Sequence, residues 1–135
     1  MSTLDNPKAL FQSTCSTNSE PYALQNIGDM MSPEFSENCI IIVDPGMLIH
    51  HKAYVIIDFN DELYFRQFII ENGMQFMSCL NKSYKDIKLN NDFEVRGCIV
   101  QQKQRKQKSL HYYLLDEKSG EMTFTDKGRE KDINP

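Results

Sequence analysis

The sequence lacks the features that mark membrane, secreted and zinc-binding proteins. No apolar run approaches the roughly 20 residues that a membrane-spanning helix requires. Residues 1–7 have neither the basic start nor the apolar stretch of a secretory signal. The four cysteines form no C-x-x-C pair and no cluster with histidine; they are Cys15, Cys39, Cys79 and Cys98. We therefore expect a cytoplasmic protein with reduced thiols and with no metal, cofactor or membrane segment.

Positive charge is also scarce. The 135 residues hold 15 Lys and Arg against 19 Asp and Glu, which gives a net charge of −4. Phosphate contacts need clustered Lys and Arg, so direct nucleic-acid binding is not expected. The densest basic stretch, residues 103–108, carries four positive groups in six residues. Such a stretch is typical of a solvated loop; weak, salt-sensitive contact with phosphates, aided by nearby aromatic rings, is the alternative.

Short β-branched and aromatic runs, separated by turn residues, dominate the chain from residue 22 onward. A two-residue turn at Asn60-Asp61 predicts a hairpin, and Asn72-Gly73 predicts a second turn. The runs that predict strands are 39–43, 54–59, 62–70, 74–80, 93–100, 111–115 and 122–124. With few helix signals, this pattern predicts a mostly β, barrel-like domain of about six or seven short strands.

Composition divides the chain into three parts. Residues 1–21 are rich in Ser, Thr, Asn and Gln and predict a flexible or loosely packed arm. Residues 22–102 hold most of the strand runs and predict the domain itself. Residues 103–135 predict a C-terminal extension made of the basic loop and a β-hairpin.

Two neighbouring motifs carry a resemblance to a known family. Residues 28–35 read G-D-M-M-S-P-E-F, and residues 39–45 read C-I-I-I-V-D-P. Together they resemble the G-D-S-M-x-P signature and the following I-I-V-D-type strand of the LexA-like and UmuD-like self-cleaving proteins, which are related to phage repressor C-terminal domains. The matching signature positions are Gly28, Asp29, Met31 and Pro33.

Later segments extend this resemblance. Residues 54–70 resemble the strand–turn–strand segment of the family, and residues 78–100 resemble its S-x-N-x-x-Y stretch and closing strand. The resemblance implies a LexA-like peptidase fold over roughly residues 22–102.

The resemblance also implies that the family's chemistry is missing. Family members cleave themselves with a serine activated by a neutral lysine. These two positions fall at Met30 and Arg66. A thioether does not attack a peptide bond and an arginine does not give up its proton, so we expect no peptidase activity. The Ala-Gly or Cys-Gly bond that the family cuts is not expected either, because Gly28 is the first glycine, and the usual DNA-binding domain is not seen.

Other roles for these residues remain open. Ser32 is a substitute nucleophile only if the site is rearranged, with Lys52 as the nearest lysine, which would make the chain an active serine hydrolase. Met30 is alternatively a packing residue, because methionine fills irregular gaps well. Arg66 is expected to pair with a carboxylate, such as Asp29 or Glu62, because an unpaired buried arginine is costly.

Residues 93–100 resemble the strand through which family members form two-fold dimers. Strict alternation predicts that Glu94, Arg96 and Cys98 share one face and that Phe93, Val95 and Gly97 share the other. The predicted interface comprises Phe93, Glu94, Val95, Arg96, Cys98 and Val100. A monomer in which residues 103–135 cover this edge is the alternative.

These observations favour a catalytically inactive LexA-like domain that acts as a dimerisation and interaction module. It would form a homodimer, or a heterodimer with a LexA-like relative, and so modulate a repressor or an SOS-type regulator. Mixed pairing would interfere with a repressor because dimeric repressors need two DNA readers. The alternative is a UmuD-like accessory factor that binds a DNA-repair polymerase or a RecA filament.

Overall fold

The β-branched and aromatic runs of the sequence form strands in the computed structural model, which describes residues 20–90 and 92–131. No helix occurs among these residues, so none could cross a membrane as a helix. The prediction of a mostly β domain is confirmed. The strands are β2 (Tyr22–Gln25), β3 (Ile40–Asp44), β4 (Tyr54–Phe59), β5 (Glu62–Glu71), β6 (Met74–Ser78), β7 (Ile87–Lys88), β8 (Phe93–Lys103), β9 (Leu110–Leu115) and β10 (Met122–Arg129).

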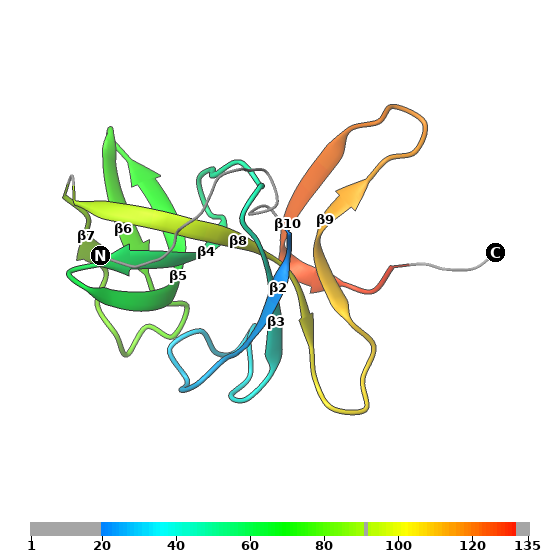
Figure 1. Cartoon of the computed structure of the whole chain (residues 1–135), viewed down its shortest axis with the longest axis horizontal. Coiled ribbons are helices and arrows are strands. Elements are labelled where there is room, and N and C mark those ends of the chain that lie inside the picture. The colour runs from blue at the N-terminus through cyan, green and yellow to red at the C-terminus, as the bar shows by residue number, and fades with distance from the viewer. Residues whose placement is uncertain (1–19, 91, 132–135) are drawn as a thin grey trace.

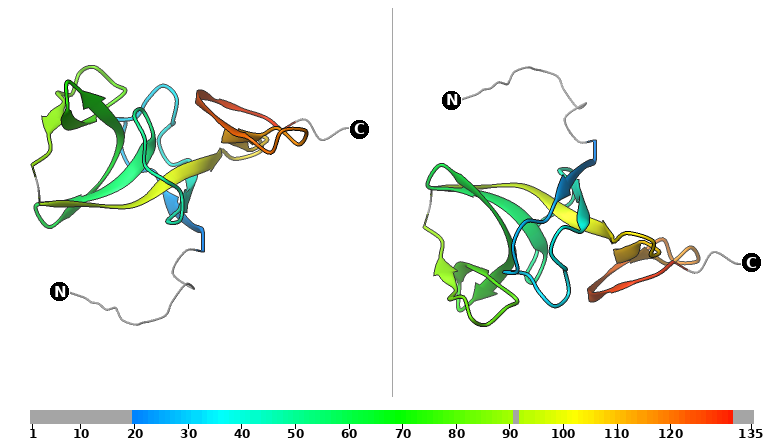
Figure 2. Two further views of the ribbon diagram at one scale, coloured as in Figure 1. Left: turned by 90° about the horizontal axis from the view of Figure 1, so that it is seen from above. Right: turned by 90° about the horizontal axis from the view of Figure 1, so that it is seen from below.

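The long strand β8 connects the parts of the sheet. The described strands form one antiparallel sheet in the order β10-β9-β8-β4-β5-β6-β7, and β3 pairs with β8 and carries β2. Cys98 lies opposite both Val55 of β4 and Asp44 of β3, so these two strands occupy opposite edges of β8. Figures 1 and 2 show β8 running from the β4–β7 part to the β2–β3 pair and the β9–β10 hairpin.

Both predicted tight turns have the backbone conformation that two-residue hairpins require. Asn60 and Asp61 have φ angles of 52° and 65°, and Asn72 and Gly73 have φ angles of 53° and 75°. Asn, Asp and Gly adopt this left-handed region more readily than other residues, which is why these dipeptides reverse the chain. The turns place β5 between β4 and β6.

The hydrophobic core is divided between the two faces of β4. Tyr54 and Ile56 point into one cluster, whereas Val55, Ile57 and Phe59 point into the other, because successive side chains of a strand alternate. The first cluster also contains Met31 and Phe35 of the 28–35 motif, Cys39, Ile41, Val43, Ile99 and Tyr112. The motif segment is therefore part of the core.

Two β-bulges interrupt the alternation along β8 and correct one prediction. Gly97 pairs with Ile56 and Val95 pairs with Ile57, which leaves Arg96 as the extra residue of a bulge. Val100 is the extra residue of a second bulge opposite β3. Beyond Arg96 the alternation is displaced by one residue, so Cys98 is fully buried in the second core cluster. The prediction that Cys98 shares a face with Glu94 and Arg96 is wrong.

Candidate functional site

The motif of residues 28–35 forms a loop between β2 and β3 that is fastened at both ends. The amide of Ser32 donates to the carbonyl of Asp29 at 3.2 Å, and the amide of Phe35 donates to the carbonyl of Met31 at 2.9 Å. Met31 and Phe35 are buried in the first core cluster. These two side chains anchor the loop in the core. Met30 lies between this anchor and β2, so its backbone is held in place.

Met30 packs over Gly28, and this contact explains the glycine. Gly28 has a φ of +94°, a region that residues with a side chain rarely adopt. A Cβ atom at Gly28 would also lie 2.9 Å from Cε of Met30. The glycine therefore provides both the turn and the space that the Met30 side chain fills.

Arg66 has no carboxylate partner in the part of the chain that the structure describes, contrary to the prediction from the sequence. Within the described residues, the only ion pairs are those of Arg96. The guanidinium of Arg66 instead donates to the carbonyl of Phe65 at 2.8 Å and lies 5.1 Å from the ring centroid of Tyr64.

The two carboxylates expected to pair with Arg66 are bound elsewhere. The hydroxyl of Tyr84 donates to Asp29 Oδ1 at 2.7 Å, and the hydroxyl of Tyr64 donates to Glu62 Oε1 at 2.7 Å. These bonds raise the pKa of both tyrosine hydroxyls, because ionisation would place a second negative charge beside each carboxylate. The carboxylates face tyrosines, and the guanidinium is left facing a cavity.

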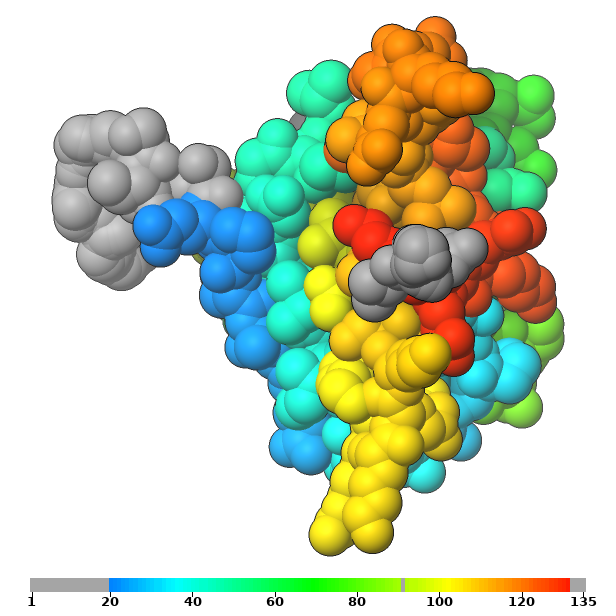
Figure 3. Space-filling model, turned by 90° about the vertical axis from the view of Figure 1, so that its right-hand side faces the viewer, coloured from blue at the N-terminus to red at the C-terminus, as the bar shows by residue number. Residues whose placement is uncertain are grey.

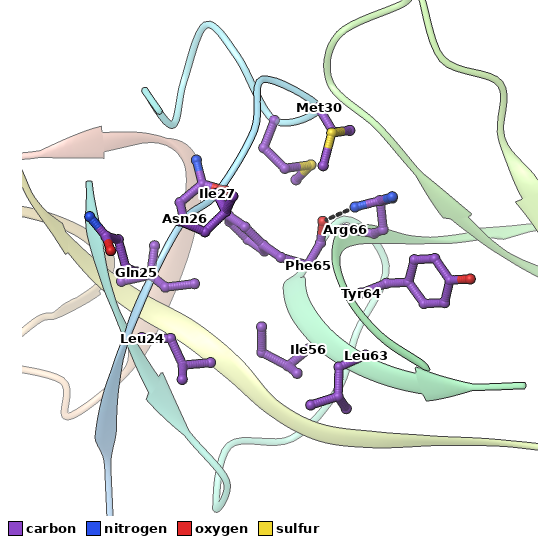
Figure 4. Close-up of a pocket in the computed structure, with 12 residues that line it drawn as sticks. Leu24, Gln25, Asn26, Ile27, Met30, Ile56, Leu63, Tyr64, Phe65 and Arg66 are labelled. Carbon is purple, nitrogen blue, oxygen red and sulfur yellow. Dashed lines mark hydrogen bonds between the residues drawn. The ribbon is translucent and has the colours of Figure 1, made fainter. Parts of the chain in front are cut away.

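Met30 and Arg66 both line this cavity, which has a volume of about 350 Å³. Figure 4 shows the two side chains reaching toward the same end of the cavity, one from the motif loop and the other from β5. Leu24 and Leu63 lie toward the other end. The remaining lining residues are Gln25, Asn26, Ile27, Met31, Ile41, Ile56, Tyr64 and Phe65.

The loop after β6 secures the motif loop from a second side. The amide of Asn81 donates to the carbonyl of Met30 at 3.0 Å, and its side-chain amide donates to the carbonyl of Asp29 at 3.1 Å. Together with the bond from Tyr84 to Asp29, these contacts explain the Asn and Tyr of the S-x-N-x-x-Y stretch as supports for the motif. Cys79 of the same loop is buried, and burial raises the pKa of its thiol while the charge of Arg66 opposes that change.

Ser32 does not line the cavity that contains Met30 and Arg66. It precedes Pro33 in a cis peptide bond and is half-buried. Lys52, the nearest lysine in the sequence analysis, is exposed in the turn before β4 and lines a different cavity with Pro33. No lysine of residues 20–90 and 92–131 lines the Met30 cavity.

Glu34 is a motif residue whose contacts sequence reasoning missed. Its Oε2 atom accepts from the hydroxyl of Tyr112 at 2.7 Å and from the amide of Gly128 at 2.8 Å, and its carbonyl accepts from Gln102 at 2.7 Å. Burial, and then the bond to Glu34, raise the pKa of the Tyr112 hydroxyl. The motif is thereby joined to β9 and β10. No local pattern signals a contact between residues so far apart in the sequence.

The predicted interface residues of β8 divide into three environments. Glu94 and Arg96 are exposed, and Arg96 forms an ion pair with Asp58 at 2.6 Å within the chain, with Glu94 3.7 Å away. Phe93 and Val95 are half-buried against the second core cluster. Cys98 is buried and Val100 is half-buried.

One edge of β8 is partly open. β4 pairs with the half of β8 that includes Phe93, whereas β3 pairs with the opposite edge only from Cys98 onward. Among the described strands, none pairs with that opposite edge before Cys98.

The basic stretch of residues 103–108 forms the turn between β8 and β9. Residues 105–108 are exposed, and this turn projects from the lower edge of the view in Figure 3. Lys103 donates to the carbonyls of Gln104 and Gln107, so one of the four positive groups is engaged by the turn itself. Among the described residues, no group of three or more His, Cys, Asp or Glu side chains is arranged to hold a metal ion.

Comparison with known proteins places this architecture in a family. Residues 2–100 match the Peptidase S24-like family, and the match ends within β8. None of the curated proteins matches the chain. The match confirms the resemblance to LexA-like and UmuD-like proteins inferred from the two motifs, and it covers well over half of the sequence. The chain therefore belongs to the Peptidase S24-like family.

Proposed function

We propose that this chain is an S24-like domain without peptidase chemistry that acts through association with other proteins. The observation that carries the proposal is the shared cavity of Met30 and Arg66, the positions where the family resemblance expects serine and lysine. A serine–lysine dyad needs a hydroxyl and a neutral amine close together. A thioether and a permanently charged guanidinium at one end of a cavity have neither the nucleophile nor the base.

The surroundings of the cavity support this proposal. No serine, threonine or lysine is among its lining residues, so no neighbour replaces the missing groups. Residues 1–27 contain no glycine and thus no Ala-Gly or Cys-Gly bond. The S24-like scaffold is retained around the cavity, which is consistent with a role in binding.

The first experiment tests for peptidase chemistry. The full chain is incubated for days at alkaline pH, where a lysine base would be neutral, and its intact mass is measured. We expect an unchanged mass of 15.7 kDa. The Ser32→Ala variant is the control: if the wild-type chain is cleaved and this variant is not, the chain is a hydrolase with a rearranged site and the proposal fails.

A second measurement asks whether residues 30 and 66 are the altered dyad. The double variant Met30→Ser, Arg66→Lys is incubated with a peptide that contains an Ala-Gly bond. Cleavage by the double variant, and by neither single variant, would support the assignment, because the two groups act as one unit. The variants must unfold at temperatures close to that of the wild type for the comparison to count.

Association is proposed to use the open edge of β8 in a homodimer or in a heterodimer with a LexA-like relative. A second β8 strand could extend the sheet there, with Glu94 and Arg96 facing their counterparts across a two-fold axis. Sedimentation velocity should show a dimer that Glu94→Lys weakens, because the change gathers positive charge at the axis. Glu37→Lys, at an exposed position of the loop between β2 and β3, is the matched control. A monomer at about 100 μM would contradict this part, and capture of a polymerase or RecA in place of a repressor relative would favour the accessory-factor alternative.

A further inference from the structure

The turn after β8 and the end of β10 form one positively charged surface, here called the basic end. It consists of residues 103–108 and 129–131, which together carry six Lys and Arg side chains and one carboxylate, that of Glu130. The rest of the chain carries nine Lys and Arg against 18 Asp and Glu. One end of an otherwise acidic chain is therefore strongly positive.

The pairing of three strands brings the two segments of the basic end together. Gln101 of β8 and Arg129 of β10 both lie opposite His111 of β9, one on each side. Directly paired residues share a face of a sheet, so Arg129 lies on the face of His111. Burial and then the charge of Lys131 lower the pKa of His111, which is consistent with a place for Lys131 beside β9. Figure 3 shows the end of β10 and the turn after β8 on one face of the molecule. Charge counts along the sequence miss this surface, because β9 and most of β10 separate the two segments.

Most cations of the basic end are free to contact a ligand. Within residues 20–90 and 92–131, the ion pairs involve only Arg96, so none of the six has a carboxylate partner there. Lys103 is engaged, because it donates to two carbonyls of the turn. Five positive groups therefore remain for contacts outside the chain. They all belong to exposed residues: Arg105, Lys106, Lys108, Arg129 and Lys131.

The turn after β8 holds its charges in a defined shape. The amide of Gln107 donates to the carbonyl of Gln104 at 3.1 Å, and the side chain of Gln104 donates to Gln102 Oε1 at 3.2 Å. Lys106 has a φ of 62°, in the left-handed region that glycine and asparagine adopt more readily than lysine does. The backbone would favour glycine here, so Lys106 brings its charge to the tip of the turn against a backbone preference.

The side chains of the turn favour the phosphates of a duplex over other anionic surfaces. Residues 103–109 are all polar. The nearby aromatic rings belong to the core, because Tyr112 is fully buried and Tyr113 and Phe124 pack against the first core cluster. Proteins that bind single strands stack bases on exposed aromatic rings, and those that bind membranes insert apolar side chains. The basic end has neither kind of side chain, whereas a duplex, whose bases are already stacked, needs only positive groups.

We propose that the basic end binds duplex DNA, with the turn after β8 in the major groove and Arg129 and Lys131 on flanking phosphates. The major groove of B-form DNA is about 12 Å wide and admits a two-stranded β-ribbon. Gln107, at an exposed position of the turn, adds an amide of the kind that pairs with adenine edges. The deep, narrow major groove of duplex RNA excludes such a turn. This site lies outside the Met30 cavity and goes beyond the proposed function.

The first experiment measures binding of the full chain to a fluorescein-labelled DNA duplex by fluorescence anisotropy. A duplex of about 20 base pairs and mixed sequence should bind with a Kd of roughly 1–10 μM at about 20 mM salt. If five cations contact phosphates, the affinity should fall about 20-fold for each doubling of the salt concentration. The competing ligands are a single strand, duplex RNA of the same sequence, and vesicles of phosphatidylserine and phosphatidylcholine. Each should bind more weakly than the DNA duplex.

Three variants and one control locate the site. Arg105→Gln and Arg129→Gln should each weaken binding at least about fivefold at about 20 mM salt and reduce the slope of log affinity against log salt by about 0.9. Lys106→Gly should weaken binding as much, although it relieves the backbone, whereas a merely structural role for Lys106 predicts no loss of affinity. Lys118→Gln, in the turn at the other end of the β9–β10 hairpin, should bind like the wild type. All four positions are exposed, so each variant should unfold at a temperature close to that of the wild type.

Several outcomes would overturn the DNA site. The first is no binding of the DNA duplex at about 50 μM protein and about 20 mM salt, since phosphate contacts alone give affinities in this range. Another is binding of the single strand, the RNA or the vesicles that equals or exceeds binding of the DNA duplex. Unchanged binding by Arg129→Gln would show that the two segments do not form one surface. An equal loss with Lys118→Gln would show that binding depends on net charge without a site.

Discussion

At the scale of single residues, several side chains of the 28–35 motif stabilise the fold. Met31 and Phe35 anchor the loop in the core, and Gly28, which has no side chain, leaves the space that the side chain of Met30 fills. Glu34 joins the motif to the last two strands, because its carboxylate accepts one bond from β9 and one from β10. Because this carboxylate is half-buried, the protein loses stability when either hydrogen bond to it is lost.

We expect Glu34→Gln to lower the free energy of unfolding by about 1–3 kcal/mol, because a neutral amide oxygen accepts the bonds from Tyr112 and Gly128 more weakly than the charged Oε2 atom does. Urea unfolding of the full chain measures the change. Glu37→Gln, at an exposed position of the same loop, is the control and should differ from the wild type by less than about 0.5 kcal/mol. Equal stability of both variants would mean that the Glu34 bonds contribute nothing net.

Buried ionisable groups make the fold sensitive to alkaline pH. Burial raises the pKa of the Cys98 thiol to about 11, and burial also raises the pKa of the hydroxyls of Tyr54, Tyr112 and Tyr113. In the unfolded chain the pKa of a cysteine thiol is about 8.5 and that of a tyrosine hydroxyl is about 10. The folded state therefore holds these protons to higher pH. The stability that the buried thiol contributes is complete below about pH 8.5 and is lost as pH rises to about 11, whereas the contribution of the tyrosines is lost only above about pH 10.

The pH dependence is testable between about pH 8.5 and 10, where the thiol effect comes before most of the tyrosine effect. The unfolding free energy of the wild type should fall over this interval, and the fall should be smaller for Cys98→Ala. The variant will also be less stable at every pH because it leaves a small cavity, so the slope is the quantity to compare. Parallel slopes in the two proteins would refute the assignment to Cys98.

At the scale of elements, the bulges of β8 set which side chains are exposed. The bulge at Arg96 brings Gly97 against β3, where an added Cβ would lie 2.6 Å from Cγ1 of Val43 and 3.2 Å from the backbone of Asp44. Only a glycine allows this approach of two strands. The bulge also turns Cys98 inward and leaves Arg96 outside, next to Asp58.

Gly97→Ala should therefore destabilise the protein by about 1–3 kcal/mol, because the added methyl group overpacks the contact with Val43. Thermal unfolding measures the effect. The double variant Gly97→Ala, Val43→Ala should lose less stability than the sum of the single changes, since removing the Val43 methyl groups relieves the contact. Additive losses would show that the strain lies in the backbone of β8 and not in this pair.

What could be predicted from the sequence depended on how local each signal was. The runs of β3, β4 and β5 and the Asn60-Asp61 turn depend on neighbouring residues, and their strands and hairpin were predicted from the sequence alone. The bulge at Arg96 depends on the contact between Gly97 and Val43, so strict alternation misplaced Cys98. β7 has two residues and no pattern of its own.

The candidate site shows the same limit. The family resemblance predicted which residues to examine, and Met30 and Arg66 do line one cavity, while their origin in a dyad stays a prediction. The expected pairing of Arg66 with a carboxylate was wrong because Tyr84 and Tyr64 bind those carboxylates. The tertiary structure decides which polar groups pair, and the local sequence does not predict these pairs.

At the scale of the whole molecule, the β9–β10 hairpin shares the core of the family-matched segment. The match ends at residue 100, yet Tyr112 of β9 is fully buried and its ring stacks on Phe35 at a centroid distance of 5.1 Å. The hydroxyl of Tyr54 donates at 2.7 Å to the carbonyl of Asp126, which lies in β10. His50 adds a bond of 2.7 Å to the hydroxyl of Tyr113. The hairpin covers the side of the first core cluster that holds the motif.

A chain truncated after residue 109 should accordingly fail to unfold cooperatively. Loss of one large aromatic core residue costs about 3–5 kcal/mol, and a domain of this size has only about 5–15 kcal/mol of stability in total. The truncation removes Tyr112 and Phe124 together and exposes Phe35 and Tyr54. Circular dichroism during heating compares the truncated and full chains, and Tyr112→Phe, which keeps the ring, should retain a cooperative transition at a lower temperature. A truncated chain that unfolds cooperatively at the temperature of the full chain would show that the matched segment has a sufficient core of its own, and the hairpin would then be an accessory to the fold.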